Sequence, residues 1–240
     1  MTESASSLER HPRPSVAVDV ALMTVMDGAL RVLLMRREDG AAVGGDWALP
    51  GGFVYIDDPL ERTVERVLRE KAGRAEAYVE QLATFGAVDR DPRGRVLSVA
   101  YLGLVPAGAL SVEGQGDLVL AELRVDWPGE AGGPASAWHD GRELELAFDH
   151  GAMLGEVVRR LRGKLDYSAI ALALLPETFT LRDVQEVHEA ILGRALNKPA
   201  FRRKLLDRGL VAPTGRRETA SAFRPAELYI RAEPAQDEEA

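Results

Sequence analysis

The chain has 240 residues, no cysteine and a formal net charge of −8 at pH 7, with 46% hydrophobic and 28% charged residues. This is the composition of a globular protein with one large domain or two modest ones, and it excludes disulfide scaffolds and thiolate metal sites. No apolar run is long enough to span a membrane, and residues 1–14 lack the apolar core of a signal peptide. We therefore expect a cytoplasmic protein with no membrane partner and a flexible tail at 1–14.

The first half of the chain alternates strand patterns with turn signals. Residues 16–26 and 30–35 are rich in Val, Leu and Met and predict two strands joined by a hairpin turn at Asp27-Gly28. The other strand candidates are 79–88, 95–105 and 122–127.

Residues 49–73, LPGGFVYIDDPLERTVERVLREKAG, predict a glycine loop followed by a helix. Gly51 and Gly52 allow the backbone to come close to a ligand. Asp58 stands at the N-cap position of a capping box, and Gly73 stands where a C′ glycine would end the helix. Between them, apolar residues recur at helical spacing and predict one buried stripe.

This loop and helix resemble the Nudix box of Nudix hydrolases. That box is a Gly, five residues, a Glu, seven residues, and then Arg-Glu-apolar-any-Glu-Glu-any-Gly-apolar. The positions that keep its framework are Gly52, Arg66, Leu68, Glu70 and Gly73, with Asp58 in place of the first Glu. The positions that depart from it are Val67 and Lys71, which replace two glutamates, and Arg74, which replaces the last apolar residue.

The replaced residues carry the chemistry of the box. Positions 67, 70 and 71 project from one face of a helix, where three carboxylates would hold Mg²⁺, neutralise a pyrophosphate and activate water. Val67 offers no oxygen ligand, and Lys71 brings a positive charge. We therefore predict a Nudix fold without a metal site and without hydrolysis. Lys71 would pair with a bound phosphate or with a neighbouring carboxylate, Glu70 or Glu61.

The order before the box resembles Nudix domains of the ADP-ribose type, in which a strand with basic residues at its end precedes Trp-x-Leu-Pro-Gly-Gly. This resemblance implies a ligand site made of Arg36, Arg37, Gly51, Gly52, Arg66 and Glu70. Arg66 could alternatively form a salt bridge with Glu70, four residues on. We assign Trp47 to the core rather than to an adenine platform.

Residues 147–150, AFDH, are similar to the sequence that precedes the last Nudix helix, which we place at 151–164. His150 would contact the ligand directly, or it would only cap the helix or make a local hydrogen bond. The sequence leaves both alternatives open.

The last third of the chain predicts a helix, a tight turn, a second helix and a hairpin, which is the order of a winged helix-turn-helix. A short apolar helix at 167–175 leads into it. The signals are Thr180 and Gly193 around the first helix, Asn197 and Gly209 around the second, and strands at 210–214 and 227–231.

Charge shifts at the same place. Residues 176–232 carry eleven basic and seven acidic residues, a net +4, whereas the rest of the chain carries −12. A basic helix is often only a solvated face, but here it follows a tight turn and precedes a basic hairpin. We predict DNA contacts from Asn197, Lys198, Arg202, Arg203, Lys204, Arg216 and Arg217, with Arg able to read guanine and the wing gripping phosphates.

Both halves together resemble the Nudix-related transcriptional regulators of the NrtR type, which control bacterial NAD metabolism. The specific evidence is the degraded box, the AFDH segment, and the segments FTLRDVQEVHEAILGRALNKPAFRRKLLDRGLVAPTG and FRPAELY. The wing at 218–224 departs from the family, in which a more glycine-rich and basic loop is expected.

The resemblance implies an α/β fold with a Nudix (α/β/α sandwich) effector domain at 15–165, a winged helix-turn-helix domain at 166–232 and an acidic disordered tail at 233–240. It also implies a homodimeric repressor that binds a palindromic double-stranded DNA operator, senses ADP-ribose or a related nucleotide and requires no cofactor.

Two alternatives remain at this point. One is a Mg²⁺-dependent ADP-ribose pyrophosphatase, with replacement carboxylates from Asp57, Asp58, Glu65 and Glu70. The other is a Nudix-like module whose winged helix binds a protein.

Overall fold

The computed structural model describes residues 11–37, 45–73, 77–110, 112, 116–219 and 225–232. The predicted acidic tail at 233–240, most of the tail at 1–14 and most of the wing loop at 218–224 lie outside these residues.

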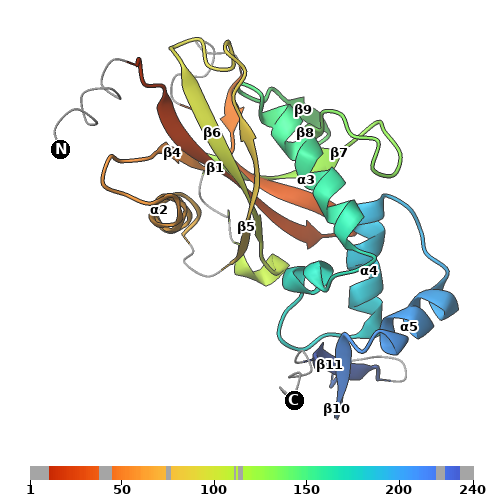
Figure 1. Ribbon diagram of the computed structural model, residues 1–240. Coiled ribbons are helices and arrows are strands. Elements are labelled where there is room, and N and C mark those ends of the chain that lie inside the picture. The colour runs from red at the N-terminus through yellow and green to blue at the C-terminus, as the bar shows by residue number, and fades with distance from the viewer. Residues whose placement is uncertain are drawn as a thin grey trace.

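A nine-stranded mixed sheet, counted over the described residues, forms the centre of the molecule (Figure 1). The strand order is β5-β6-β1-β2-β7-β8-β9, with β4 added on β1 and β3 on β2. The strands are β1 (Ser15–Met26), β2 (Ala29–Arg36), β3 (Trp47–Ala48), β4 (Gly51–Phe53), β5 (Tyr78–Phe85), β6 (Val96–Leu104), β7 (Leu118–Arg124), β8 (Ser136–His139) and β9 (Arg142–Leu144).

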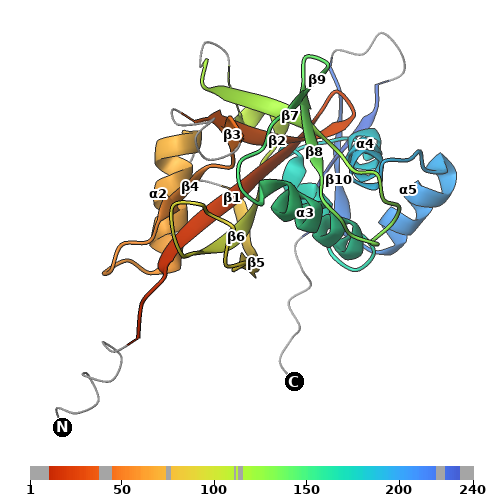
Figure 2. The ribbon, with the colours of Figure 1, turned by 90° about the horizontal axis from the view of Figure 1, so that it is seen from above.

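Helices cover both faces of this sheet. Helix α2 (Leu60–Ala72) packs on one face and α3 (His150–Lys164) on the other, as Figure 2 shows from above. A short 3₁₀ helix, η2 (Ala107–Ala109), follows β6. The predicted α/β/α sandwich is therefore confirmed.

Side-chain alternation along β1 explains the two layers. Val18, Val20 and Leu22 belong to the buried cluster under α2, whereas Ala21 and Met23 belong to the cluster under α3. Successive side chains of a strand point to opposite faces, so one apolar strand serves both cores.

The predicted hairpin is present, because Asp27 and Gly28 both have positive φ (54° and 71°) between β1 and β2. The predicted capping box on α2 is wrong. Pro59, in extended conformation, occupies the N-cap with no side-chain cap, and Asp58 instead meets Arg62 at 3.3 Å. Asp58 lies one residue too early for its carboxylate to reach the free N–H groups of the first turn. Gly73 ends the helix in the left-handed region, as predicted.

The C-terminal elements form a winged helix. They are the 3₁₀ helix η3 (Ile170–Leu174), α4 (Leu181–Leu192), α5 (Lys198–Asp207), and the hairpin β10 (Val211–Arg217) and β11 (Glu227–Arg231). The segment predicted as a helix at 167–175 is only this 3₁₀ helix. Leu175, the residue before Pro176, is already extended, as residues before a proline tend to be, so the 3₁₀ helix ends there.

The predicted caps of this region are confirmed. Thr180 and Asp183 form a reciprocal capping box at the start of α4. Asn197 accepts a hydrogen bond from the amide of Ala200 at 3.1 Å at the start of α5. Gly193 ends α4 with φ 67°. The turn between the two helices is therefore fixed locally by its own sequence.

The hydrophobic core of the α3 face continues into the winged helix. The same buried cluster holds α3 residues such as Val157 and Leu161 and the winged-helix residues Val184, Val187, Ile191, Phe179, Leu205, Val211 and Tyr229. In the described part of the chain the winged helix thus packs on the Nudix layer without a separate core. None of the described helices is long and apolar enough to cross a membrane.

Candidate functional site

A cavity of about 1030 Å³ opens where β1 changes partner. β1 pairs with β4 at Ala17–Asp19 and with β2 only from Met23 onward, while the far end of β2 pairs with β3 at Met35 and Arg36. The diverging strands leave a gap in the sheet. Its volume suits a nucleotide-sized ligand.

Asp19 lies at the floor of this cavity. Alternation along β1 turns its side chain to the α3 face, where Ser98 Oγ donates to Asp19 Oδ2 at 2.5 Å. Gly51 crosses directly beside it, and a Cβ at Gly51 would overlap Asp19 Oδ1 and come within 2.9 Å of the Val18 carbonyl. Only glycine fits at position 51, because any side chain would collide with β1.

His150 stands beside Asp19 as the first residue of α3. Its Nδ1 accepts the amide hydrogen bond of Leu49 at 3.1 Å, so its hydrogen lies on Nε2, which is 3.8 Å from Asp19 Oδ1. The side chain is 2% exposed, and this burial lowers the pKa of His150 despite the neighbouring Asp19. The imidazole is neutral and holds the 49–52 segment against α3. This hydrogen bond joins segments far apart in sequence, so it is not the local bond predicted for His150, and the side chain also lines the cavity.

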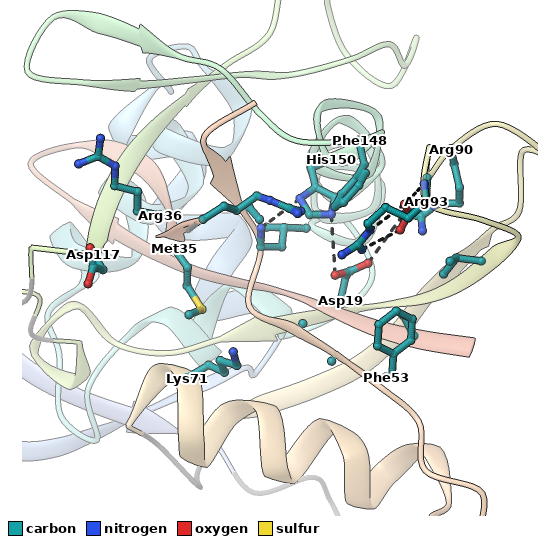
Figure 3. Close-up of a pocket in the computed structure, with 18 residues that line it drawn as sticks. Asp19, Met35, Arg36, Phe53, Lys71, Arg90, Arg93, Asp117, Phe148 and His150 are labelled. Atoms are coloured by element: carbon teal, nitrogen blue, oxygen red, sulfur yellow. Dashed lines mark hydrogen bonds and ion pairs between the residues drawn. The ribbon is translucent and has the colours of Figure 1, made fainter. Parts of the chain in front are cut away.

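Two arginines from the loop after β5 form the wall opposite the box helix (Figure 3). Arg90 donates to both oxygens of Asp149 at 2.9 and 2.6 Å, and Arg93 pairs with Asp91 at 2.8 Å. Burial alone would lower the pKa of Arg90, but the hydrogen bonds and charge of Asp149 produce a net rise. The hydrogen bonds from Arg93 hold the pKa of Asp91 below its ordinary value.

The aromatic ring of Phe148 contacts the guanidiniums of two arginines. Its backbone has φ 54°, and the guanidinium carbons of Arg37 and Arg93 lie 4.5 and 5.4 Å from its ring centroid. The ring edge also meets His150, with centroids 5.6 Å apart. Cationic groups stack favourably on such a ring. Phe148 therefore orients two arginines of the cavity wall.

The other end of the cavity is open and basic. Arg36 and Lys71 reach it from β2 and α2, with Met35 and Asp117 nearby, as Figure 3 shows. Among the described residues, the lining holds five basic residues (Arg36, Arg37, Lys71, Arg90 and Arg93) and three acidic ones (Asp19, Asp91 and Asp117). An excess of positive charge in a polar cavity favours an anionic ligand.

These residues do not fit Mg²⁺, the ion that the Nudix fold implies. Val67 is 1% exposed and packs into the core under α2, and Lys71 is the box-helix residue that lines the cavity. Over the ranges described, no three His, Asp or Glu residues cluster so as to hold a metal. The positive charge of Lys71 would repel a bound Mg²⁺, so the described cavity does not support metal-dependent chemistry.

The six predicted ligand residues fall into two groups. Arg36, Arg37, Gly51 and Gly52 line the cavity, whereas Arg66 and Glu70 do not. Arg66 donates to the Phe53 carbonyl at 2.8 Å, covers the Tyr55 ring at 4.3 Å and lies 3.9 Å from Glu70. It stabilises the loop before the helix, which matches the salt-bridge alternative more closely than ligand binding. Trp47 packs partly buried against the core, away from the cavity lining.

The predicted DNA-contacting residues lie on α5 and the wing. Lys198 and Arg203 are exposed, and Arg202 is half-buried with an Nε that finds no hydrogen-bond partner among the described atoms. Lys204 instead pairs with Asp166 at 2.8 Å, on the side facing α3. On β10, Arg216 is exposed, and Arg217 donates to the Pro225 carbonyl at 2.9 Å across the wing.

Comparison with known proteins agrees with this architecture. The model of the NUDIX domain matches residues 13–132, and that of the NrtR DNA-binding winged helix domain matches residues 171–230. The chain is 36% identical over 221 residues, covering 91% of this chain and 82% of the relative, to the ADPR responsive transcriptional repressor NtrR of Acinetobacter baylyi. This chain belongs to the NrtR family.

Two further proteins are similar to this NrtR-family chain, one in structure and one in sequence. The crystal structure of Shewanella oneidensis NrtR complexed with a 27mer DNA is similar with a TM-score of 0.73 and 35% identity, over 90% of this chain and 93% of that chain. An ADP-ribose pyrophosphatase of Methanocaldococcus jannaschii is 28% identical over 150 residues, 62% of this chain and 76% of the relative. The predicted family and the two-part fold are confirmed.

Sequence reasoning about this NrtR-family chain missed part of the cavity wall. Four residues line it that were not among the predicted ligand residues: Asp19 in a predicted strand, Arg90 and Arg93 between two strand candidates, and Phe148 in the AFDH segment. One signal was available, since Asp19 is a lone carboxylate in an otherwise apolar strand. A buried charge of that kind requires a partner, and a partner search would have pointed to this site.

Proposed function

We propose that this protein is a transcriptional repressor of NAD-metabolism genes that binds ADP-ribose or a related nucleotide in the cavity and releases its operator DNA in response. The observation that carries the proposal is Lys71, a cation in the wall of a nucleotide-sized cavity at a position where a Nudix hydrolase has a glutamate. A lysine there can bind a phosphate but cannot bind Mg²⁺.

The cavity supports a diphosphate between two sugars. Arg36, Arg37 and Lys71 would hold the phosphates, and the β4 backbone at Gly51 and Gly52 would approach a ribose. The guanidiniums of Arg90 and Arg93, each paired with an aspartate, would form the far end of the ligand site. The name of the Acinetobacter relative supports ADP-ribose as the effector.

The winged helix supports operator binding. Helix α5 would enter the major groove, with Asn197, Lys198, Arg202 and Arg203 at the bases and backbone, and Arg216 and Arg217 on phosphates at the wing. Lys204 would join them only after leaving Asp166. The Shewanella relative crystallised with DNA supports this assignment.

The proposal also covers the oligomeric state of the protein, its location in the cell and its metal requirement. We propose a homodimer, because two-fold operators are read by two-fold proteins, and a cytoplasmic protein that needs no metal cofactor. We also propose that the division at 15–165 and 166–232 separates two functional halves, whose buried residues share one hydrophobic cluster. The hydrolase alternative has the archaeal pyrophosphatase in its favour but lacks a set of magnesium ligands in the described cavity.

Fluorescence anisotropy tests the proposal. The full chain is titrated onto labelled duplexes from upstream of its own gene and of neighbouring NAD genes, at fixed salt, with and without ADP-ribose. We expect sequence-specific binding that ADP-ribose weakens. Absence of specific binding on every duplex, together with Mg²⁺-dependent release of AMP from ADP-ribose, would replace the repressor with the hydrolase.

A further inference from the structure

Helix α3 begins at the cavity, which its first residue His150 lines, and it packs against α4 of the winged helix, the two helices lying close together in Figure 2. Its first residue, His150, and its N-cap residue, Asp149, take part in the cavity wall through Leu49 and Arg90. Its last turns face α4. Fifteen residues of α-helix span about 22 Å, so one rigid element reaches from the effector site to the DNA-binding half.

The packing of α3 on the loop before β8 leaves little room for independent movement. A Cβ at Gly155 would overlap the carbonyl oxygen of Gly133, and one at Gly151 would lie 3.2 Å from the Ala135 carbonyl. Two glycines thus let the helix contact the loop backbone directly. The helix and this loop will shift together, because neither has space to slide past the other.

Arg162, near the C-terminal end of α3, joins this unit to α4. Its Nε donates to the Ile191 carbonyl at 3.0 Å, and its Nη1 donates to the carbonyls of Trp127 and Gly129 at 3.2 and 2.9 Å. Its guanidinium carbon lies 5.0 Å from the centroid of a Trp127 ring. Three acceptors in two different segments fix a single orientation of the fork.

Arg162 contacts α4 at its last turn, which leads into α5. Ile191 stands in the last turn of α4, where carbonyls lack intrahelical partners and carry the negative end of the helix dipole. Gly193 ends that helix, and a Cβ there would lie 3.5 Å from Arg162 Nη2. The recognition helix α5 begins a few residues later, so the position of this turn sets the direction of α5.

Other polar contacts of the winged helix reach the segment at or after the end of α3. Arg208 donates to the carbonyls of Leu165 and Ser168, Lys204 pairs with Asp166, and Arg231 donates to the Leu172 carbonyl. These contacts hold the winged helix in place. Arg162 differs because it projects from the body of α3 to the turn that orients α5.

We infer that Arg162 is the positioning residue that couples occupancy of the cavity to the orientation of the recognition helix. This inference rests on the proposed function and adds the residue that transmits it. Removing Arg162 leaves the cavity and the DNA-binding surface intact but removes the energetic coupling between them. Because coupling is reciprocal, the loss must be equal whether it is measured on DNA or on ADP-ribose.

The test is a linkage measurement on the full chain. Operator Kd is measured with and without saturating ADP-ribose, and ADP-ribose Kd with and without operator, for the parent and for Arg162→Met. Parent coupling in the usual range is about 5- to 150-fold. In Arg162→Met we expect both ratios to fall below about twofold while ADP-ribose Kd of the DNA-free protein stays within about twofold of the parent.

The matched control is Arg159→Met. Arg159 stands one turn earlier on the same helix, and in the described part of the chain its Nε and Nη2 donate to the two carboxylate oxygens of Glu156. The control removes the same guanidinium from α3 and should keep the coupling ratio of the parent. Arg162→Lys, which keeps the charge but loses the fork, should recover part of the coupling.

A second readout needs no operator. Hydrogen exchange of α4 and α5 amides is followed with and without ADP-ribose, and the expected change in the parent should disappear in Arg162→Met. If this variant no longer binds operator, the exchange result decides: a persisting ADP-ribose effect overturns the inference.

Failure of the inference and failure of the proposed function give different results. An Arg162→Met protein with the coupling ratio of its parent overturns the inference alone. A parent whose operator affinity ignores ADP-ribose overturns the proposed function, and the inference with it.

Discussion

The two faces of the central sheet pack against different parts of the molecule. On one face, α2 packs over Val18, Val20 and Leu22 in a cluster that stays within the Nudix layer. On the other, α3 shares its cluster with the winged helix, through residues such as Ile191 and Leu205. The first face carries the signature helix of the fold and the second carries the DNA-binding half.

This difference shows that packing and chemistry are separable in a helix. Val64, Val67 and Leu68 hold α2 in the core, and none of them is an oxygen ligand. The fold therefore survives at a position where a family glutamate is replaced by valine. The α3 face could not be altered so freely, because its apolar residues also seat a second module.

The largest expected effect lies on the α3 face. Replacing Arg202 and Arg203 by Ala should weaken operator binding at least about thirtyfold, because each arginine that contacts a base contributes about 1–3 kcal/mol. ADP-ribose affinity should not change. Anisotropy and calorimetry measure the two values, with Arg182→Ala on the neighbouring helix, paired only with Glu186 at 2.9 Å among the ion pairs described, as control. Unchanged operator binding would mean that α5 is not the recognition helix.

Acid should destabilise the α3 side of the molecule through two buried histidines, one at the start of α3 and one in α4. Burial lowers the pKa of His150 and of His188, so each is neutral in the folded chain and binds a proton more readily when unfolded. Stability is then complete above the unfolded pKa of about 6.5 and falls as the pH drops toward the lower folded pKa, by up to about 1.4 kcal/mol per pH unit per histidine.

Urea unfolding between pH 7.5 and pH 5 measures this slope. His150→Gln and His188→Gln should each make the dependence shallower, and the double variant shallower still. A slope that both variants leave unchanged would show that other groups cause the acid sensitivity.

A smaller effect, on ADP-ribose affinity, is expected from the α2 face. Lys71→Gln should weaken ADP-ribose binding about five- to tenfold, since one charged hydrogen bond to a phosphate contributes about 1.5 kcal/mol or less in an open site. Arg69→Gln, an exposed change two residues away that does not reach the cavity lining, should leave it unaltered. Calorimetry distinguishes them. Equal loss in both variants would indicate a general charge effect rather than a contact by Lys71.

The smallest effect belongs to Glu70. It is 57% exposed and lies 3.9 Å from Arg66, a distance at which an ion pair contributes about 0.5 kcal/mol or less. Glu70→Gln should change neither ADP-ribose affinity nor the thermal midpoint by a measurable amount. A clear loss of ADP-ribose binding would restore Glu70 to the ligand site predicted from the sequence.

Local signals predicted most of the secondary structure. The caps at Thr180, Gly193 and Asn197 are confirmed because each depends on hydrogen bonds within four residues. The strands β8 and β9 were missed, since they are short and depend on long-range pairing, of β8 with β7 and of β9 with β8. The capping box at Asp58 failed by one residue, which pattern alone cannot resolve.

The sequence by itself determined the family, the two-part fold and the loss of the magnesium ligands, because these depend on residue identity and spacing along the chain. Only the tertiary structure decided which side chains form the cavity. Asp19, Arg90 and Phe148 come from segments far apart in sequence, and they meet because β1 changes partner and α3 begins beside it. Tertiary packing also decided that Arg162 contacts α4, since an arginine on a helix carries no sign of which carbonyl it will reach.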